Sequence, residues 1–398
     1  MKSIGSFVVA FVVMAVSAGR ATAGQDQGDR FRFSVNTRAE YTDNRDASET
    51  DEASNWDFYL RPRADVLLGD PDRALLDLYY APSIRYRTDP SIAQNETELQ
   101  HDLGLHAKYR ASRRLVLRAS EKFDLTDDGS VSQDGSTIRG DRSYIRNDIR
   151  AGADFLAGRQ TEVDLSVGNR IKRYDEADAA STSDEDRTDA GIKLIQHFSG
   201  NTRASLEGRY SLYSYESPGL LMRDFDSILG ALGVEKMLSK NLTVGGQLGA
   251  QMQSYDDPGI NDSTSPFARL FVRGSTTPSL RLNTTLTHAV RDSDAFPFAS
   301  QEYSELSARA DWDTTPHVTL TLSGLYRLSN YDDVAPSAAA LAALIGRDET
   351  TIAVSGQAAY KLNDSLTVQV RQRFEDVDSD VSTSFSKNTT TLELTKHF

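Results

Sequence analysis

The residue types best suited to acid–base and nucleophilic chemistry are scarce in this chain. It contains no Cys, and its six His residues are His101, His106, His197, His288, His317 and His397. A hydrolytic site needs a nucleophile beside a base, with a third group that orients the base. The sequence around these His residues shows no such constellation, and the Asp-rich segments contain no His. We therefore expect a protein that is not an enzyme.

An acidic segment, 175–186, is the best candidate for binding a divalent cation, because its carboxylates supply the oxygen ligands that Ca²⁺ prefers. It lacks the spacing of an EF-hand loop or of a nonapeptide repeat. A solvated acidic loop is therefore the favoured interpretation. We expect no metal site and no cofactor.

The first 23 residues have the pattern of a secretory signal peptide. Met1-Lys2 is followed by an apolar run over 4–18, and Ala21-Thr22-Ala23 is the small-residue pattern of a cleavage site between Ala23 and Gly24. A membrane anchor is the alternative, but the run is shorter than the roughly 20 residues of a spanning helix. We expect 1–23 to be removed and 24–398 to form one domain, since no linker divides it.

The charge of the chain argues against a nucleic-acid partner. Its net charge is −14, and removal of 1–23 takes away Lys2 and Arg20, which leaves 42 − 58 = −16. Phosphate binding requires a basic surface, so we exclude this class of partner.

Alternation with period two is the strongest structural signal. In residues 31–41 the positions Phe31, Phe33 and Val35 alternate with Arg32, Ser34 and Asn36. One apolar and one polar face is typical of a strand with one side against lipid or a core. Eighteen such segments are predicted: 31–41, 56–68, 74–86, 99–109, 115–125, 143–155, 161–173, 188–198, 204–214, 226–238, 242–255, 266–274, 280–290, 302–312, 318–328, 350–361, 366–374 and 388–398.

The connections alternate between short turns and long acidic loops, such as 42–55, 126–142, 175–187 and 329–349. This layout predicts an all-β, transmembrane antiparallel up-and-down barrel of the bacterial outer membrane, with its short turns in the periplasm. Sixteen strands would result if 266–274, the least regular segment, were misread. A soluble sandwich or propeller is disfavoured, because its second strand face would have to bury many charges.

The polar face should line a water-filled lumen, because a barrel of this size is too wide for side chains to fill. Its charges have mixed sign, so cross-strand ion pairs are the simpler interpretation and a path for anions or sugar acids is the alternative. The charged residues expected to face inward are Arg32, Arg38, Asp57, Arg61, Arg63, Asp65, Asp77, Arg85, Asp102, Lys108, Arg118, Lys122, Asp124, Arg146, Asp148, Arg150, Asp154, Arg170 and Lys172.

The strand ends carry two further signals. Phe398 ends an amphipathic segment, which resembles the signal that the barrel-assembly machinery recognises, although Lys396 departs from that pattern. Aromatic residues near strand ends indicate girdles at the lipid boundaries: Tyr41, Trp56, Tyr86, Tyr109, Tyr210, Tyr255, Trp312, Tyr326 and Tyr360. Within loop 329–349, Pro336 to Gly346 predicts a short helix. It either caps the rim or narrows the pore.

Three motifs stand out within residues 31–125. They are Tyr41-Thr42-Asp43-Asn44, Trp56 to Arg61-Pro62, and Leu76-Asp77-Leu78-Tyr79-Tyr80-Ala81-Pro82. Together they resemble the Putative beta-barrel porin 2 family, whose members are often encoded in exopolysaccharide operons. The resemblance implies a porin-like channel involved in exopolysaccharide export. A non-conducting scaffold that binds polysaccharide or envelope partners, and a general uptake porin, remain alternatives. The expected partners are outer-membrane lipid, lipopolysaccharide, the assembly machinery and a polysaccharide.

Overall fold

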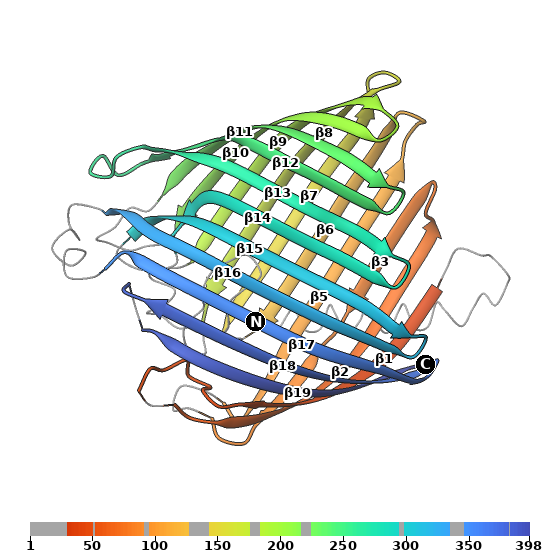
Figure 1. The fold of residues 1–398 in the computed structure, drawn as a ribbon, viewed down its shortest axis with the longest axis vertical. Coiled ribbons are helices and arrows are strands. Elements are labelled where there is room, and N and C mark those ends of the chain that lie inside the picture. Colours follow the sequence, from red (N-terminus) through yellow and green to blue (C-terminus); the bar gives the residue numbers. More distant parts are fainter. Residues whose placement is uncertain are drawn as a thin grey trace, which may run out of the picture.

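The strands of the protein form one closed antiparallel barrel (Figure 1). The computed structural model describes residues 30–50, 52–90, 95–126, 143–175, 184–215, 224–293, 298–334, 346–381 and 383–398. Each strand in these ranges pairs with its neighbours in sequence, and β1 (Arg30–Thr42) pairs with β19 (Phe385–His397) to close the sheet. No helix among the described residues is long and apolar enough to cross a membrane.

Nineteen strand segments make eighteen barrel strands, because one strand is interrupted. β3 (Ala74–Tyr80) and β4 (Ser83–Arg87) both pair with β2 (Asn55–Asp70) and β5 (Thr97–Arg110). Pro82 has no N–H to donate to the ladder, and this accounts for the break. The register runs through it without a slip, from Tyr80 opposite Ala64 to Ile84 opposite Leu60. The predicted eighteen-stranded barrel is thus confirmed, with segment 74–86 split in two.

The other strands are long enough to cross the hydrocarbon layer. Segment 266–274, the least regular by sequence, lies within one of them, β13. Their bounds are β6 (Leu115–Thr126), β7 (Tyr144–Leu156), β8 (Thr161–Tyr174), β9 (Glu185–Ser199), β10 (Thr202–Tyr215), β11 (Phe225–Ser239), β12 (Leu242–Tyr255), β13 (Ser263–Thr277), β14 (Leu280–Asp292), β15 (Phe298–Thr315), β16 (Val318–Val334), β17 (Asp348–Asn363) and β18 (Leu366–Ser379).

Several strands extend further at the loop end than the sequence predicts. β16 continues to Val334 and β18 to Ser379, while β15 already begins at Phe298. Past the lipid boundary both faces of a strand meet water, so the apolar alternation stops although the hydrogen-bonded ladder continues. The predicted loop 329–349, and the gaps 375–387 and 291–301 between predicted strands, are therefore too long.

The outer face carries the exposed apolar side chains. Leu232, Leu248 and Leu322 are 66%, 64% and 61% exposed, as expected for side chains that contact lipid. Most of the predicted girdle aromatics also lie on this face, with Trp56 and Trp312 45% and 51% exposed. Tyr255 is an error of the prediction: its register partner is Phe225, it is only 8% exposed, and it packs in a cluster at the loop end.

The barrel closes at its turn end through the last residue. The N–H of Phe398 donates to the carbonyl of Phe33 at 2.9 Å, and the two rings lie 5.6 Å apart between centroids. The closing β1–β19 ladder has nine register pairs, from Ser34 opposite His397 to Thr42 opposite Thr389. Phe398 therefore has a structural partner in the finished barrel, in addition to its predicted role as an assembly signal.

Replacing Phe398 by Ala is expected to lower the amount of folded protein in the outer membrane several-fold, because it removes the ring contact at the seam and the predicted signal. The folded fraction can be measured by heat-dependent mobility in SDS electrophoresis of outer-membrane fractions. Phe155→Ala, another exposed aromatic near the turn end, is the control. Equal folded fractions for the two variants would contradict the prediction.

Candidate functional site

The inner wall of the barrel is the candidate functional site. The cross-strand register places all the side chains predicted to face inward, from Arg32 on β1 to Lys172 on β8, on one face. Directly opposite pairs include Arg32 with Asp65, Lys108 with Arg118, and Arg146 with Lys172. The exposed apolar residues occupy the other face. A role of the inward residues in lining a pore stays a prediction.

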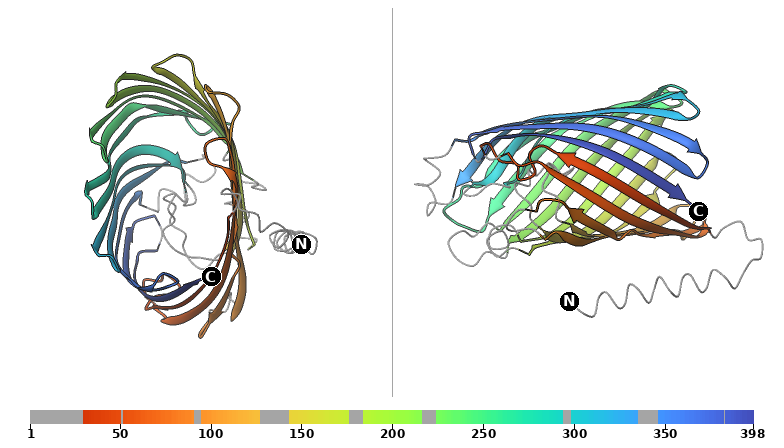
Figure 2. Two further views of the ribbon diagram at one scale, coloured as in Figure 1. Left: turned by 90° about the vertical axis from the view of Figure 1, so that its right-hand side faces the viewer. Right: turned by 90° about the horizontal axis from the view of Figure 1, so that it is seen from below.

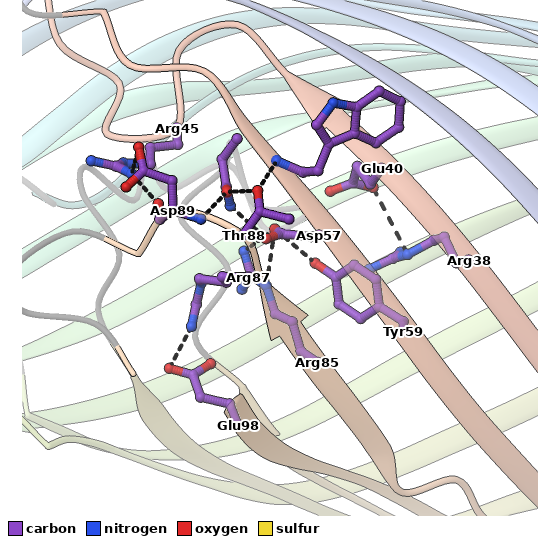
Figure 3. Close-up of polar contacts among 12 residues, drawn as sticks. Arg38, Glu40, Arg45, Asp57, Tyr59, Arg85, Arg87, Thr88, Asp89 and Glu98 are labelled. Atoms are coloured by element: carbon purple, nitrogen blue, oxygen red, sulfur yellow. Dashed lines mark hydrogen bonds and ion pairs between the residues drawn. The ribbon is translucent and has the colours of Figure 1, made fainter. Parts of the chain in front are cut away.

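At the loop end, one part of this wall is a buried ion-pair cluster (Figure 3). Asp57 accepts hydrogen bonds from Arg85 at 2.6 and 3.0 Å and from Asn55 at 2.6 Å. Arg87, only 1% exposed, pairs with Glu98 at 2.8 Å. Burial makes such pairs rigid, because either charge without its partner would be strongly destabilised.

The same cluster includes a ring that holds two guanidinium groups. Arg38 stacks over the Tyr59 ring at 3.7 Å, and Arg85 lies 5.5 Å from the same ring. The Tyr59 hydroxyl lies 3.4 Å from Asp57. These contacts join β1, β2 and β4 (Figure 3). The cluster is therefore best explained as a structural support of the loop end.

The wall formed by β10–β12 is also densely packed at the loop end. Tyr213, Tyr215, Phe225 and Tyr255 form an aromatic cluster with loop residue Ile260 and with Ala299 of β15. The Tyr215 hydroxyl donates to Asp292 of β14 at 2.8 Å, a contact between strands that are not neighbours. Side chains therefore fill part of the lumen near this end.

Further from the loop end, the inner wall carries carboxylates that are each shared by two cations. Three such triads occur among the described residues. They are Arg146 and Arg170 on Asp148 (2.5 and 2.7 Å), Arg209 and Lys193 on Glu207 (2.7 and 3.4 Å), and Arg203 and Arg273 on Glu235 (2.6 and 3.1 Å). Each triad has one excess positive charge. Arg118 shows the reverse arrangement, in which one guanidinium pairs with two carboxylates, those of Asp154 and Asp164.

Some cations of the inner wall have no ion pair with any described residue. Arg32, Arg150 and Arg269 are exposed and lie at inward register positions, opposite Asp65, Gly168 and Gln247. Lys172 lies over two rings, at 4.8 Å from Tyr144 and 4.7 Å from Tyr174. Across the described strands, inward Lys and Arg outnumber inward Asp and Glu, although the whole chain is acidic.

The remaining predicted inward residues pair locally. Arg61 binds Asp102, which also accepts a hydrogen bond from Tyr79 at 2.8 Å. Arg63 binds Asp65 of its own strand at 2.7 Å and stacks over Tyr79 at 4.1 Å. Further along the wall, Lys122 pairs with Asp124 at 3.0 Å, Asp77 lies opposite His106, and Lys108 donates to the carbonyl of Pro71 at 3.4 Å.

One arrangement was missed by the sequence analysis. On the outer face, His288 Nδ1 lies 2.9 Å from the Ser304 hydroxyl, and His288 Nε2 lies 3.4 Å from Glu302. Ser304 lies inside β15, paired with β14 and β16. Its backbone neighbours therefore donate to the ladder and are not free to stabilise an oxyanion, as hydrolysis would require. Only the strand pairing of 288 with 304 could have revealed this contact.

Several predicted features lie outside the described residues. They are the signal peptide with its Ala23–Gly24 cleavage site, most of the acidic segment 175–186, and the helix expected from Pro336 to Gly346. These features stay predictions.

The sequence matches the family Putative beta-barrel porin 2 over residues 31–398. The chain therefore belongs to this family and is a porin-like β-barrel protein of the bacterial outer membrane. Its fold is similar to that of OpdK from Pseudomonas aeruginosa, at 12% identity and a TM-score of 0.50, over 93% of this chain and 99% of that chain. OccK7 (OpdD) of the same organism is similar at 11% identity and a TM-score of 0.50, over 94% and 99%. A comparison with curated proteins gave no match.

Removing Asp57 should reveal the structural role of the buried cluster. Asp57→Ala leaves Arg85 buried without its carboxylate, so the free energy of unfolding should fall by about 3–5 kcal/mol. Arg281→Ala removes an exposed ion pair with Asp313, and should cost far less stability, because water screens the two charges. Urea unfolding of both variants in detergent micelles measures the difference. Equal losses would show that burial does not set the strength of these pairs.

Proposed function

We propose that this protein is a water-filled channel through the outer membrane, that its inner wall favours anions, and that it exports an acidic exopolysaccharide. The observation that carries the proposal is the excess of cations on the inner wall of a chain whose net charge is −14. The three triads in which one carboxylate serves two cations, and the unpaired Arg150 and Arg269, account for much of that excess.

The physical reason is the electrostatic potential inside a narrow aqueous lumen. Fixed positive charges on a wall backed by lipid raise the local concentration of anions and lower that of cations. A polymer with regularly spaced carboxylates could exchange one guanidinium contact for the next as it moves. Its weak binding at many sites would favour passage over trapping. The resemblance to a family often encoded in exopolysaccharide operons supports a polysaccharide as the cargo.

A non-conducting scaffold is the second candidate, and the packing at the loop end favours it. Arg87, Arg327, Tyr331 and Gln301 are each at most 1% exposed there, so part of the lumen is filled. A general uptake porin is the third candidate. A conducting channel would exclude the scaffold, and loss of polymer secretion on gene deletion would exclude uptake as the sole function.

Conductance in planar lipid bilayers tests the channel itself. The mature protein should produce discrete current steps, and its reversal potential in a KCl gradient should have the sign of chloride selectivity. Purified protein that inserts, as shown by protection from protease, but carries no current would support the scaffold instead.

Arg150→Glu combined with Arg269→Glu should shift the reversal potential toward cation selectivity, because the change places two negative charges at unpaired positions of the wall. Lys240→Glu, in the short turn between β11 and β12, changes the charge of the chain in the same direction outside the lumen and is the control. A shift of equal size in both variants would contradict selection by the inner wall.

Deletion of the gene in the native host should lower the amount of secreted acidic polysaccharide. The wild-type gene should restore secretion, and the Arg150→Glu, Arg269→Glu variant should restore it only in part. Unchanged secretion in the deletion strain would refute the assignment of cargo, while bilayer currents would still establish the channel.

A further inference from the structure

A polar patch interrupts the lipid-facing surface of β6–β9. Glu121 on β6 lies opposite Ile149 on β7, which lies opposite Asn169 on β8, and Asn169 lies opposite Thr188 on β9. Ile149 is 47% exposed on the outer face, so the whole row faces outward. Asn147, two residues along β7 from Ile149, shares this face.

Glu121 is the most unusual member of the patch. Among the described residues it is the only acidic side chain at an outward position whose outward neighbours along the strand, Ala119 and Phe123, are both apolar. It forms no hydrogen bond or ion pair with a described residue. Polar and ionisable groups that face hydrocarbon are costly and are retained where they meet a partner. The position of Glu121 therefore indicates that this surface is covered.

The neighbouring amides support this inference. Asn147 adds a second polar side chain to a face of apolar residues, although its Oδ1 atom is buried and is not itself available to a partner. Asn169 donates to the Thr188 hydroxyl at 3.1 Å and to the carbonyl of Arg187 at 3.2 Å. The Thr188 hydroxyl, which accepts from Asn169, keeps its own proton to donate. The patch thus presents both acceptors and donors.

The shape of the part of this surface on β6 and β7 suits a flat contact. In Figure 2 the far wall of Figure 1, which contains β3, β5, β6 and β7, is nearly straight in cross-section, whereas the wall of green to blue strands is bowed. Small outward residues, Ala119, Ala151 and Ala190, are exposed around the patch and would let two backbones approach closely. A bowed wall would touch a neighbour along a narrow line, whereas two straight walls can bury a broad surface.

We propose that β6–β9 form the interface with a second copy of this chain in the outer membrane. A two-fold related contact is self-complementary only if one surface supplies both donors and acceptors. This patch supplies Glu121 as an acceptor and the exposed Thr188 hydroxyl as a donor. A second copy would therefore satisfy the polar groups that lipid cannot. The inference does not depend on conduction.

The absence of Cys from the chain makes a direct test available. Ile149→Cys and Val167→Cys place single thiols on the proposed interface, at positions 47% and 53% exposed, and Leu322→Cys places one on the bowed wall at 61%. Outer membranes treated with a short bis-maleimide should yield a product of twice the chain mass for the first two variants and not for the third. Equal yields for all three, or a product of another mass, would overturn the proposal.

A second variant tests whether the polar residues of the patch contribute to association or merely lie near the contact. Glu121→Leu with Asn147→Leu, in the Ile149→Cys background, should reduce the dimeric product several-fold while the protein still folds, as judged by heat-dependent mobility. The matched pair Leu248→Ala with Leu270→Ala, on the outer face of β12 and β13, should leave the yield unchanged. An undiminished dimer in the Leu variant would contradict a role of these polar groups in association.

Discussion

The whole structure depends on one constraint, which is that hydrocarbon offers no hydrogen-bond partner to a peptide group. Every strand that crosses the bilayer must find its partners in other strands, so the sheet has to close on itself. The β1–β19 ladder and the contact of Phe398 with Phe33 achieve this closure. Once the ladder is closed, the two faces are in different solvents, and the alternation of the sequence follows from that difference.

The inner face shows how access to water determines how much an ion pair contributes to stability. Near the loop end, Asp57, Arg85 and Arg87 have lost most of their water, so each needs its partner and the cluster is rigid. Further along the wall, Arg209 and Arg273 remain 45% and 54% exposed, and water screens their ion pairs. Such side chains can release a carboxylate for a passing anion at little cost. Ion pairs of Arg with carboxylates thus support the structure near the loop end, and further along the wall they form the proposed anion-selective surface.

Much of this fold could be predicted from the sequence, since parity alone assigns each strand residue to lipid or lumen. The eighteen strands and the inward position of Arg150 or Asp148 follow from period two. Three features could not be predicted, because they depend on which strands are neighbours and on where lipid ends. The first is the pairing of Glu235 with Arg203 on β10 and Arg273 on β13. The second is the contact between Ser304 and His288. The third is the inward position of Tyr255, which lies past the end of the apolar alternation. Pro82 signals a break, but only the register shows that the strand resumes in phase.

The most direct measurement is the accessibility of spin labels placed singly at successive positions from 322 to 326 of β16 in lipid vesicles. A closed barrel with lipid outside and water inside predicts alternation at every step. Labels at 322, 324 and 326 should collide with oxygen dissolved in the bilayer, and labels at 323 and 325 with a water-soluble paramagnetic complex. Uniform accessibility to the water-soluble complex at all five positions would contradict the barrel, and with it every role assigned to its inner wall.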